Sequence, residues 1–302
     1  MHITVFGAGS LGSFIGGRLS IKHHVGIIGG HSHINAIKQK GLRITGKTNL
    51  IVYPKTSLQD CQNPELLILT VKAYDTKKAV MDASSLIGPH TSVLSLQNGF
   101  RNEKIIGDII GRTKVIGGVT SHGVTLLRPG EIHHTGLGDT VIGEMDGHIT
   151  SRIKHISAVF NQVGIKTKIS RNITKELYIK AVVNAGINPI TALFNCKNGE
   201  LLFNPFMEHI LELTCKEAVD IITKSGIRLP SDILKRVKKV AQCTSDNYSS
   251  MAQSIQCHKK TEIEQINGEI VALAEKLDRQ APLNKMLTLF IKALEYENTA
   301  VA

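Results

Sequence analysis

Tryptophan is absent from this chain of 302 residues, and aromatic residues make up only 4% of it. Basic residues exceed acidic residues by enough to give a net charge of +11, yet no run of five or more lysines and arginines occurs. Nucleic-acid-binding surfaces usually combine a basic stripe with stacking aromatic side chains, and the sequence has neither. The scattered positive charge therefore favours small anionic ligands over nucleic acid.

Cysteine and histidine do not form the patterns of a disulfide framework or a metal site. The five cysteines are odd in number and contain no C-x-x-C pair, which favours a reducing, cytoplasmic compartment without structural zinc. The pairs His31/His33 and His133/His134 have no cysteine or carboxylate at ligand spacing. We therefore predict solvated loop histidines and no bound metal.

Long apolar runs and targeting segments are also missing. The N-terminus has no basic segment followed by an apolar run and a cleavage site. The longest apolar runs, such as Leu66–Leu69, are far shorter than the roughly 20 residues that a membrane-spanning helix needs. We therefore predict no membrane association.

Strand and helix patterns alternate through the first half of the chain. Continuous apolar strands separated by helices are typical of a parallel sheet that is covered on both faces. The predicted strands are 2–6, 25–28, 66–71 and 92–96, and the first two predicted helices are 10–20 and 32–40. Alternation around Gly46 predicts a hairpin over 42–53, inserted at one edge of this sheet.

The pattern changes after residue 114 and again after residue 170. Antiparallel strands are predicted for 114–144, a helix for 151–163 and a short strand for 166–169, whereas only helical patterns occur from Ile173 to Glu297. We therefore predict an α/β protein with two domains. They are an N-terminal Rossmann-type doubly wound sheet (1–170), which binds a dinucleotide, and a C-terminal all-helical domain (171–302), which holds substrate and catalytic residues.

The segment GAGSLG fits the dinucleotide-binding fingerprint G-x-G-x-x-G, and it lies between the first predicted strand and the first predicted helix. In this motif the first glycine permits a tight turn, the second lets a pyrophosphate approach the backbone, and the third lets helix and strand pack closely. The alternative is a glycine-rich turn without a ligand. The predicted cofactor-binding residues are Gly7, Ala8, Gly9, Ser10, Leu11 and Gly12.

The second strand ends in IIGGHSHI, which contains neither the acidic residue typical of NAD binders nor the arginine typical of NADP binders. A missing carboxylate removes a repulsion against a 2′-phosphate, which His31, Ser32 or Lys38 could contact. The sequence therefore favours NADP, with NAD left open because Gly30 occupies this place.

Two later strands are followed by polar residues, in LTVKAY and LSLQNGF. Ligands of open parallel sheets bind beyond the carboxyl ends of the strands, so Lys72 and Asn98 are candidates for the place where nicotinamide and substrate meet. The alternatives are a solvated lysine at a strand end and an Asn-Gly turn.

The helix ELYIKAVVNAGINP carries Lys180, Asn184 and Asn188 on one otherwise apolar surface, because residues four apart share a face. Farther on, NYSSMAQSIQCHKKTEIEQINGEI begins with a serine pair suited to a helix N-cap. On a straight helix Ser250 and Glu262 would be about 18 Å apart, so they would hold a substrate and the cofactor beside it. Each polar residue has a plainer interpretation as a solvated, capping or ion-paired group.

These ordered motifs resemble 2-dehydropantoate 2-reductases, the ketopantoate reductase family, along nearly the whole chain: GAGSLG, VKAY, LQNG, K-x-x-x-N-x-x-x-N-P and SSM…TEIEQINGEI. The resemblance implies that NADPH reduces 2-dehydropantoate to pantoate, in pantothenate and coenzyme A biosynthesis. It also implies Lys180 as catalytic general acid and Glu262 as catalytic acidic residue. Substrate binding is implied for Asn98, Asn184, Asn188, Asn198 and Ser250, and a place beside the cofactor for Lys72. From their positions in the sequence we also predict cofactor contacts for His31, Asn98 and Glu262.

The sequence departs from the family at two positions, with Gly30 where an arginine is common and Ser254 where an aspartate is often found. We expect Lys180 to stabilise charge on the substrate oxygen and supply a proton, and Glu262 to lie toward the cofactor ribose or orient Lys180. The alternatives are a related dehydrogenase for another 2-oxo or 3-hydroxy acid, and a protein that senses dinucleotides without catalysis. The partner is expected to be a small anionic 2-oxo acid, and a homodimer is left open.

Overall fold

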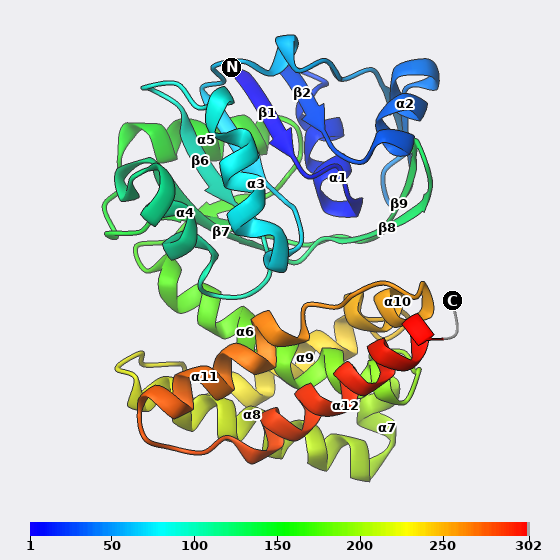
Figure 1. Ribbon diagram of the computed structural model, residues 1–302, viewed down its shortest axis with the longest axis vertical. Coiled ribbons are helices and arrows are strands. Elements are labelled where there is room, and N and C mark those ends of the chain that lie inside the picture. The colour runs from blue at the N-terminus through cyan, green and yellow to red at the C-terminus, as the bar shows by residue number, and fades with distance from the viewer. Residues whose placement is uncertain (301–302) are drawn as a thin grey trace. The chain divides into compact units, whose positions relative to one another are not determined.

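The computed structural model describes residues 1–300, and its internal contacts divide the chain into two compact units (Figure 1). The first unit comprises Met1–Gln97 and Arg101–Glu176. The second comprises Asn98–Phe100 and the chain from Leu177 onward. The sequence placed a division at 170/171, just ahead of helix α6 (Ile173–Leu193), whereas the units divide within this helix.

A seven-stranded sheet forms the centre of the first unit, in the order β11-β10-β7-β6-β5-β1-β2. The five strands from β7 to β2 in this order are parallel to one another, whereas β10 is antiparallel to β7. The predicted strands and the parallel sheet are therefore confirmed. The bounds are β1 (His2–Phe6), β2 (His24–Ile28), β5 (Leu66–Leu69), β6 (Ser92–Ser95), β7 (Val115–Thr120), β10 (Thr140–Glu144) and β11 (Thr167–Ile169).

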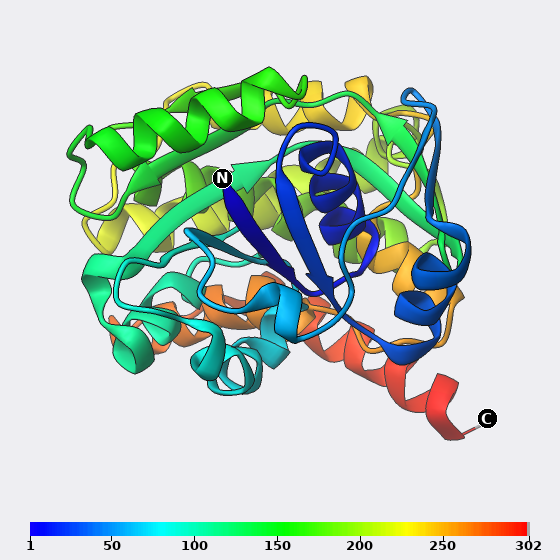
Figure 2. The ribbon, with the colours of Figure 1, turned by 90° about the horizontal axis from the view of Figure 1, so that it is seen from above.

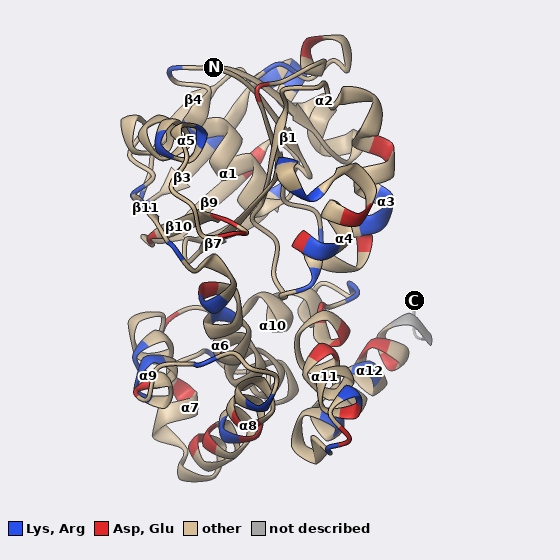
Figure 3. Cartoon of the chain, turned by 90° about the vertical axis from the view of Figure 1, so that its left-hand side faces the viewer, with Lys and Arg blue, Asp and Glu red and all other residues tan. Residues whose placement is uncertain are grey.

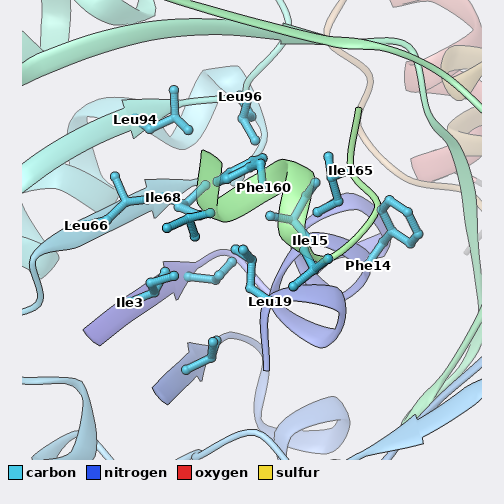
Figure 4. Close-up of a cluster of buried hydrophobic side chains, with 14 of the residues drawn as sticks. Ile3, Phe14, Ile15, Leu19, Leu66, Ile68, Leu94, Leu96, Phe160 and Ile165 are labelled. Carbon is cyan, nitrogen blue, oxygen red and sulfur yellow. The ribbon is translucent and has the colours of Figure 1, made fainter. Parts of the chain in front are cut away.

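Helices cover both faces of this sheet, as the continuous apolar strands predicted. In β5, Leu66 and Ile68 belong to the cluster formed with α1 (Ser10–Leu19) and α5 (Ser151–Gln162). Leu67 and Leu69 point to the opposite face and pack with α3 (Thr76–Ala83) and α4 (Asn102–Ile110). Figure 2 shows the two helix layers on either side of the strands, and Figure 4 shows the α1/α5 side of the core.

The hairpin predicted over 42–53 forms, but its predicted place at the edge of the main sheet is wrong. Strands β3 (Leu42–Gly46) and β4 (Leu50–Val52) are antiparallel, and they belong to a separate four-stranded sheet in the order β4-β3-β9-β8. The predicted antiparallel segment 114–144 is divided between the two sheets. Strands β8 (Gly123–Arg128) and β9 (Glu131–Gly136) join the second sheet, where β9 is parallel to β3.

Helix α1 packs against both sheets through two consecutive glycines. A Cβ on Gly16 would meet Ile27 of the main sheet at 2.7 Å, and a Cβ on Gly17 would meet Ile44 of the second sheet at 2.9 Å. Both distances are below ordinary carbon contacts. Glycine therefore lets one helix lie closely against two layers, and this fixes the helix that begins at the glycine-rich loop.

His33 of α2 (His31–Lys40) and His134 of the second sheet are buried, contrary to the prediction of solvated loop residues, whereas His31 is exposed as predicted. His33 is 5% exposed and His134 is 1% exposed. The His134 ring contacts Phe14 of α1, and its Nε2 lies 3.2 Å from Nδ1 of His122. Burial lowers the pKa of His122 to about 4 and also lowers the pKa of His134. These histidines are therefore neutral core residues, which join α1 to the second sheet.

The second unit consists of helices packed around one apolar core. Lysines and acidic residues are interspersed on the surface of α8, where Lys216 and Lys224 pair with residues four positions earlier (Figure 3). No helix within residues 1–300 combines the length and apolar character that crossing a bilayer requires. The remaining bounds are α7 (Glu200–Phe203), α8 (Pro205–Lys224), α9 (Ile233–Cys243), α10 (Ser250–Gln256), the π-helical segment η5 (Glu264–Gly268), α11 (Glu269–Lys276) and α12 (Pro282–Ala300).

Candidate active site

The glycine-rich loop has the geometry that its sequence predicted. Gly7 has φ of +115°, and a Cβ there would meet the backbone nitrogen of Val71 at 2.5 Å. A Cβ on Gly12 would meet the carbonyl oxygen of Gly7 at 2.1 Å. Thr70 donates a hydrogen bond of 2.8 Å from Oγ1 to the same carbonyl. Gly7 is therefore required for the left-handed backbone of the turn and for its close approach to Val71, and Gly12 is required for the close approach of α1 to the turn.

Gly9 differs from the other two glycines, because a Cβ there would have no atom within 4 Å. Gly9 is exposed and forms the N-cap of α1, whose first turn contains no acidic residue. The first backbone N–H groups of a helix lack intrahelical partners and attract anions. The packing of the loop therefore does not require glycine at position 9, and the open space there lies beside backbone N–H groups that could hold a pyrophosphate.

The end of β2 offers space but no carboxylate. A Cβ on Gly29 would meet Cβ of Ala8 at 2.4 Å, which brings this turn against the glycine-rich loop. Gly30 is the N-cap of α2, and a Cβ there would have no atom within 4 Å. His31 is exposed and lies 3.3 Å from the Asn35 amide. Nothing acidic in the first turn of α2 would repel a ribose phosphate.

Lys72 lies three residues beyond β5, in a turn that is held by buried polar side chains. Gln97 donates from Nε2 to the carbonyl oxygen of Val71 at 3.0 Å and to Oγ1 of Thr76 at 2.8 Å. Thr76 in turn donates to the carbonyl oxygen of Ala73. Since β1 and β5 are neighbours, this turn and the glycine-rich loop share the carboxyl edge of the sheet. The strand order reverses between these two strands, where doubly wound sheets bind their ligands.

The polar stripe of α6 is partly buried, as expected for a helix with one functional face. Lys180 and Asn184 have intermediate exposure, and Asn188 is 6% exposed. Leu177, Val182 and other apolar neighbours are buried. A solvated surface stripe would leave all three polar side chains exposed, so this plainer interpretation does not fit α6.

The segment Asn98–Phe100 contacts both α6 and the Glu262 segment within the second unit. Its Nδ2 donates a hydrogen bond of 2.9 Å to Oε2 of Glu262, which is 5% exposed. Two residues later, the Phe100 ring stacks on Tyr178 of α6 at a centroid distance of 4.6 Å. The chain after β6 is therefore fixed to both elements. The sequence predicted that Glu262 lies toward the cofactor ribose or orients Lys180, and it did not predict a bond to Asn98. In the structure the Glu262 carboxylate restrains the Asn98 amide.

The segment 247–270 is not a straight helix, so the predicted separation of about 18 Å between Ser250 and Glu262 has no basis. Helix α10 ends at Gln256, and π-helical η5 begins at Glu264. Ser249, rather than Ser250, is the N-cap, because its Oγ accepts a bond from the backbone N–H of Ala252. Ser250 is the first helical residue and is exposed.

The start of α10 lies beside the C-terminal part of α6. Thr191, three residues after Asn188, donates a hydrogen bond of 2.7 Å from Oγ1 to Oγ of Ser249. Asn198 is 7% exposed and donates from Nδ2 to Oγ1 of Thr244 at 2.8 Å. Ser254 donates to the carbonyl oxygen of Ser250, which satisfies its hydroxyl within the helix.

Two models of the same family match the chain, one for ketopantoate reductase PanE/ApbA over residues 3–147 and one for its C-terminal region over residues 172–295. A 2-dehydropantoate 2-reductase of Pyrococcus horikoshii is 37% identical over 298 residues, which cover 98% of each chain. The chain belongs to the ketopantoate reductase family. The predicted family and the α/β fold are therefore confirmed.

Solved ketopantoate reductases and a related dehydrogenase share the fold. The PanE/ApbA family ketopantoate reductase from Ralstonia eutropha JMP134 has a TM-score of 0.91 at 26% identity, covering 99% of this chain and 100% of that one. D-mandelate dehydrogenase with NADH and anilino(oxo)acetate has a TM-score of 0.93 at 26% identity, covering 99% of both chains. The fold therefore occurs in enzymes that reduce or oxidise different acids.

Sequence reasoning missed several polar residues that hold the site. Gln97 orients the Lys72 turn, and Thr191 with Ser249 joins α6 to α10. The signal for Gln97 was its place beside Asn98 after a buried strand.

Within residues 1–300 no three His, Cys, Asp or Glu side chains gather as metal ligands would. Ser13 and His33 are hydrogen bonded, but His33 Nδ1 accepts from the Gly130 N–H, so its neutral ring donates to Ser13 rather than activating it.

Proposed function

We propose that this protein reduces 2-dehydropantoate to pantoate in the cytoplasm, as a step of pantothenate and coenzyme A biosynthesis. The main support is the chain's family membership together with the Asn98–Glu262 bond, which ties the segment after β6 to the unit that carries Lys180. A dinucleotide-binding protein without catalysis would need the glycine-rich loop but not a half-buried lysine and amide stripe.

When bound, a reduced nicotinamide cofactor would supply a hydride to C2 of the 2-oxo acid. The ammonium group of Lys180 stabilises the negative charge that develops on the carbonyl oxygen, and then gives that oxygen a proton. In this proposal the side-chain amide of Asn98 donates a hydrogen bond toward the same oxygen. Glu262 acts by holding the amide of Asn98 in this orientation.

The substrate is held by residues from three elements of the second unit. Ser250, at the start of α10, takes the carboxylate, because the N-terminus of a helix favours an anion. Asn184 and Asn188 bond the distal hydroxyl, and Asn198 supports this end of the pocket. A site built to bond a hydroxyl group rejects analogues that lack it, because its buried amides are then left unpaired.

NADPH is the favoured cofactor. The glycine-rich loop takes the pyrophosphate, and Lys72 contacts the nicotinamide side. In this proposal His31 contacts the 2′-phosphate at the end of β2, and the absence of an acidic group from the first turn of α2 supports this assignment. Gly30 leaves room for this phosphate but supplies no charge, so NADH is accepted as a weaker alternative.

The second candidate function is oxidoreduction of another 2-oxo or 3-hydroxy acid. It is favoured by the similarity in fold to D-mandelate dehydrogenase. A panel containing ketopantoate, 2-oxoisovalerate and 3-hydroxy acids separates the two candidates.

Light scattering of the same preparation tests for a homodimer, for which the highly exposed Phe203 and Phe206 provide apolar surface.

The decisive experiment is initial-rate oxidation of NADPH and NADH with ketopantoate, for wild type and Lys180→Ala. We expect wild-type turnover and a kcat reduced by about 100-fold or more in the variant. Lys175→Ala is the matched control, since it removes the same group from the same helix outside the polar stripe. An inactive wild type refutes the substrate, and an active Lys180→Ala refutes the assigned proton donor.

A further inference from the structure

Helix α6 contains a proline that deprives it of one backbone hydrogen bond. Pro189 lies inside the helix, four residues after Ala185. An α-helix joins the N–H of each residue to the carbonyl four residues earlier, and proline has no N–H. The carbonyl oxygen of Ala185 therefore lacks the donor that an α-helix would normally supply four residues later. Ala185 is fully buried, so water is kept away from its surroundings.

The side chain of Asn267 replaces the missing donor. Its Nδ2 donates a hydrogen bond of 3.1 Å to the carbonyl oxygen of Ala185. Asn267 is fully buried, and it comes from a segment 82 residues farther along the chain. A carbonyl can only accept, so the amide nitrogen must face it. The bond therefore corrects the defect that Pro189 creates.

This bond connects the two chain segments that carry the proposed catalytic groups. Ala185 directly follows Asn184 and lies between Lys180 and Asn188 on α6. Asn267 lies in the π-helical segment that begins two residues after Glu262. π-Helical turns are rare and are frequently found at functional sites. The Asn267 bond thus fixes the middle of the polar stripe relative to the Glu262 segment.

Further buried bonds hold Asn267 itself. The second hydrogen of its Nδ2 goes to Oδ1 of Asn284 at 3.0 Å, and Asn284 is also fully buried. Asn284 donates to Oε1 of Glu217 at 2.8 Å, and Glu217 accepts from the backbone N–H groups of Leu283 and Asn284. The chain of bonds thus extends from α6 through η5 to the start of α12 and to α8. The two bonds of Nδ2 set the orientation of the Asn267 amide, whereas its Oδ1 is buried without a hydrogen-bond partner among the described residues.

We infer that Asn267 is a positioning residue of the active site, which sets Lys180 and Asn184 against Glu262 by bonding the Ala185 carbonyl left open by Pro189. The inference rests on the proposed function for its catalytic consequence. Displacements of about 1 Å can cost roughly 100-fold in rate. Asn267 touches neither substrate nor cofactor in this assignment, so its effect is on kcat rather than on cofactor binding.

The test is a set of four proteins: wild type, Asn267→Leu, Pro189→Ala and the double variant. Leucine keeps the branched outline of Asn267, although it is somewhat larger, and it donates no hydrogen bond. Alanine at 189 restores the backbone N–H that Ala185 lacks. We expect Asn267→Leu to lower kcat about 10- to 100-fold, with the KM for NADPH changed less than about threefold, and to lower the Tm by about 5 °C. Thr214→Val, which loses a buried hydroxyl from α8 of the same unit, controls for lost stability alone.

The double variant separates positioning from stabilisation. We expect it to regain at least half of the lost Tm, because the Ala185 carbonyl is again bonded, while kcat remains low. Recovery of kcat together with Tm would mean that Asn267 only satisfies a carbonyl, and would overturn the inference. So would an Asn267→Leu variant with unchanged kcat.

Hydrogen exchange gives a readout that does not depend on the substrate. Exchange in the peptide Asn184–Leu193 should be at least tenfold faster in Asn267→Leu than in wild type, since the local opening becomes easier. A wild type without ketopantoate turnover would refute the proposed function only. Unchanged exchange in this peptide would refute the Asn267 inference whether or not turnover is detected.

Discussion

Replacing Gly9 or Gly12 by alanine adds one methyl group to the same loop, yet the two variants should behave in opposite ways. At Gly12 the new Cβ would lie 2.1 Å from the Gly7 carbonyl oxygen and 2.4 Å from Thr70 Oγ1. Ordinary contacts begin at about 3.4 Å, so the backbone must move by roughly 1 Å or more. Overpacking of this kind typically costs about 1–3 kcal/mol. We therefore expect the Tm of Gly12→Ala to fall by roughly 4–10 °C.

At Gly9 the new Cβ meets nothing within 4 Å, and the backbone, with φ of −79°, suits alanine. The only folding cost is that alanine caps a helix less well than glycine, which is worth up to about 1 kcal/mol. The methyl group would instead occupy the space that the pyrophosphate needs. We therefore expect the Kd for NADPH to rise at least about tenfold, which corresponds to about 1.4 kcal/mol.

Thermal unfolding without cofactor measures the first effect, and titration calorimetry with NADPH measures the second. The two variants control for each other, because the chemical change is identical. A Gly9→Ala protein that binds NADPH as tightly as wild type would show that the phosphate does not lie above Gly9. A Gly12→Ala protein as stable as wild type would refute the packing argument for the third glycine.

Three further predictions concern cofactor choice, pH and the start of α10. Gly30→Arg should raise the ratio of kcat/KM for NADPH over NADH about tenfold in steady-state assays, because an arginine has room there and pairs with a 2′-phosphate; an unchanged ratio would place the phosphate elsewhere. The pKa of His122 is about 4 in the folded protein and near 6.5 in the unfolded chain, so its contribution to stability is complete above pH 6.5. As the pH falls from 6.5 toward 4, the unfolded chain binds a proton that the folded protein does not. The free energy of unfolding should then decrease by about 1–2 kcal/mol, a value reduced to allow for the partial exposure of the ring. Denaturant unfolding at these pH values should show a shallower fall for His122→Phe, and an equal slope would exclude this residue. Ser249→Ala should lose about 0.5–2 kcal/mol of unfolding free energy through its lost cap, whereas Ser250→Ala should keep its stability and raise the KM for ketopantoate severalfold; the reverse pattern would exchange their roles.

The elements that were predicted well are those whose signal is local. The strand over 66–71 and the helix over 151–163 follow from apolar periodicity, and both form close to the predicted bounds. The glycine-rich loop was also predictable, because each glycine has a steric reason within a few residues or in the neighbouring strand. The conformation of the glycine-rich loop is determined by the strand before it and the helix after it, which are both adjacent in the sequence.

The features that sequence reasoning missed depend on partners far along the chain. The hairpin over 42–53 was recognised, but β3 pairs with β9, almost ninety residues later, and no local pattern identifies that partner. The break between α10 and η5 was missed because the apolar spacing continues across it. Asn267 looked like any helix residue, since its importance depends on a proline 78 residues earlier.

The excursion of Asn98–Phe100 into the second unit limits how this chain can be divided for protein engineering. A fragment that starts at Leu177 would lack the ring that stacks on Tyr178 and the amide that binds Glu262. A chimera that exchanges the helical unit between relatives would therefore pair the donor's helices with the recipient's three-residue segment. If residues 98–100 are exchanged together with the helical unit, the ring contact and the amide–carboxylate bond are each formed by residues from the same parent protein.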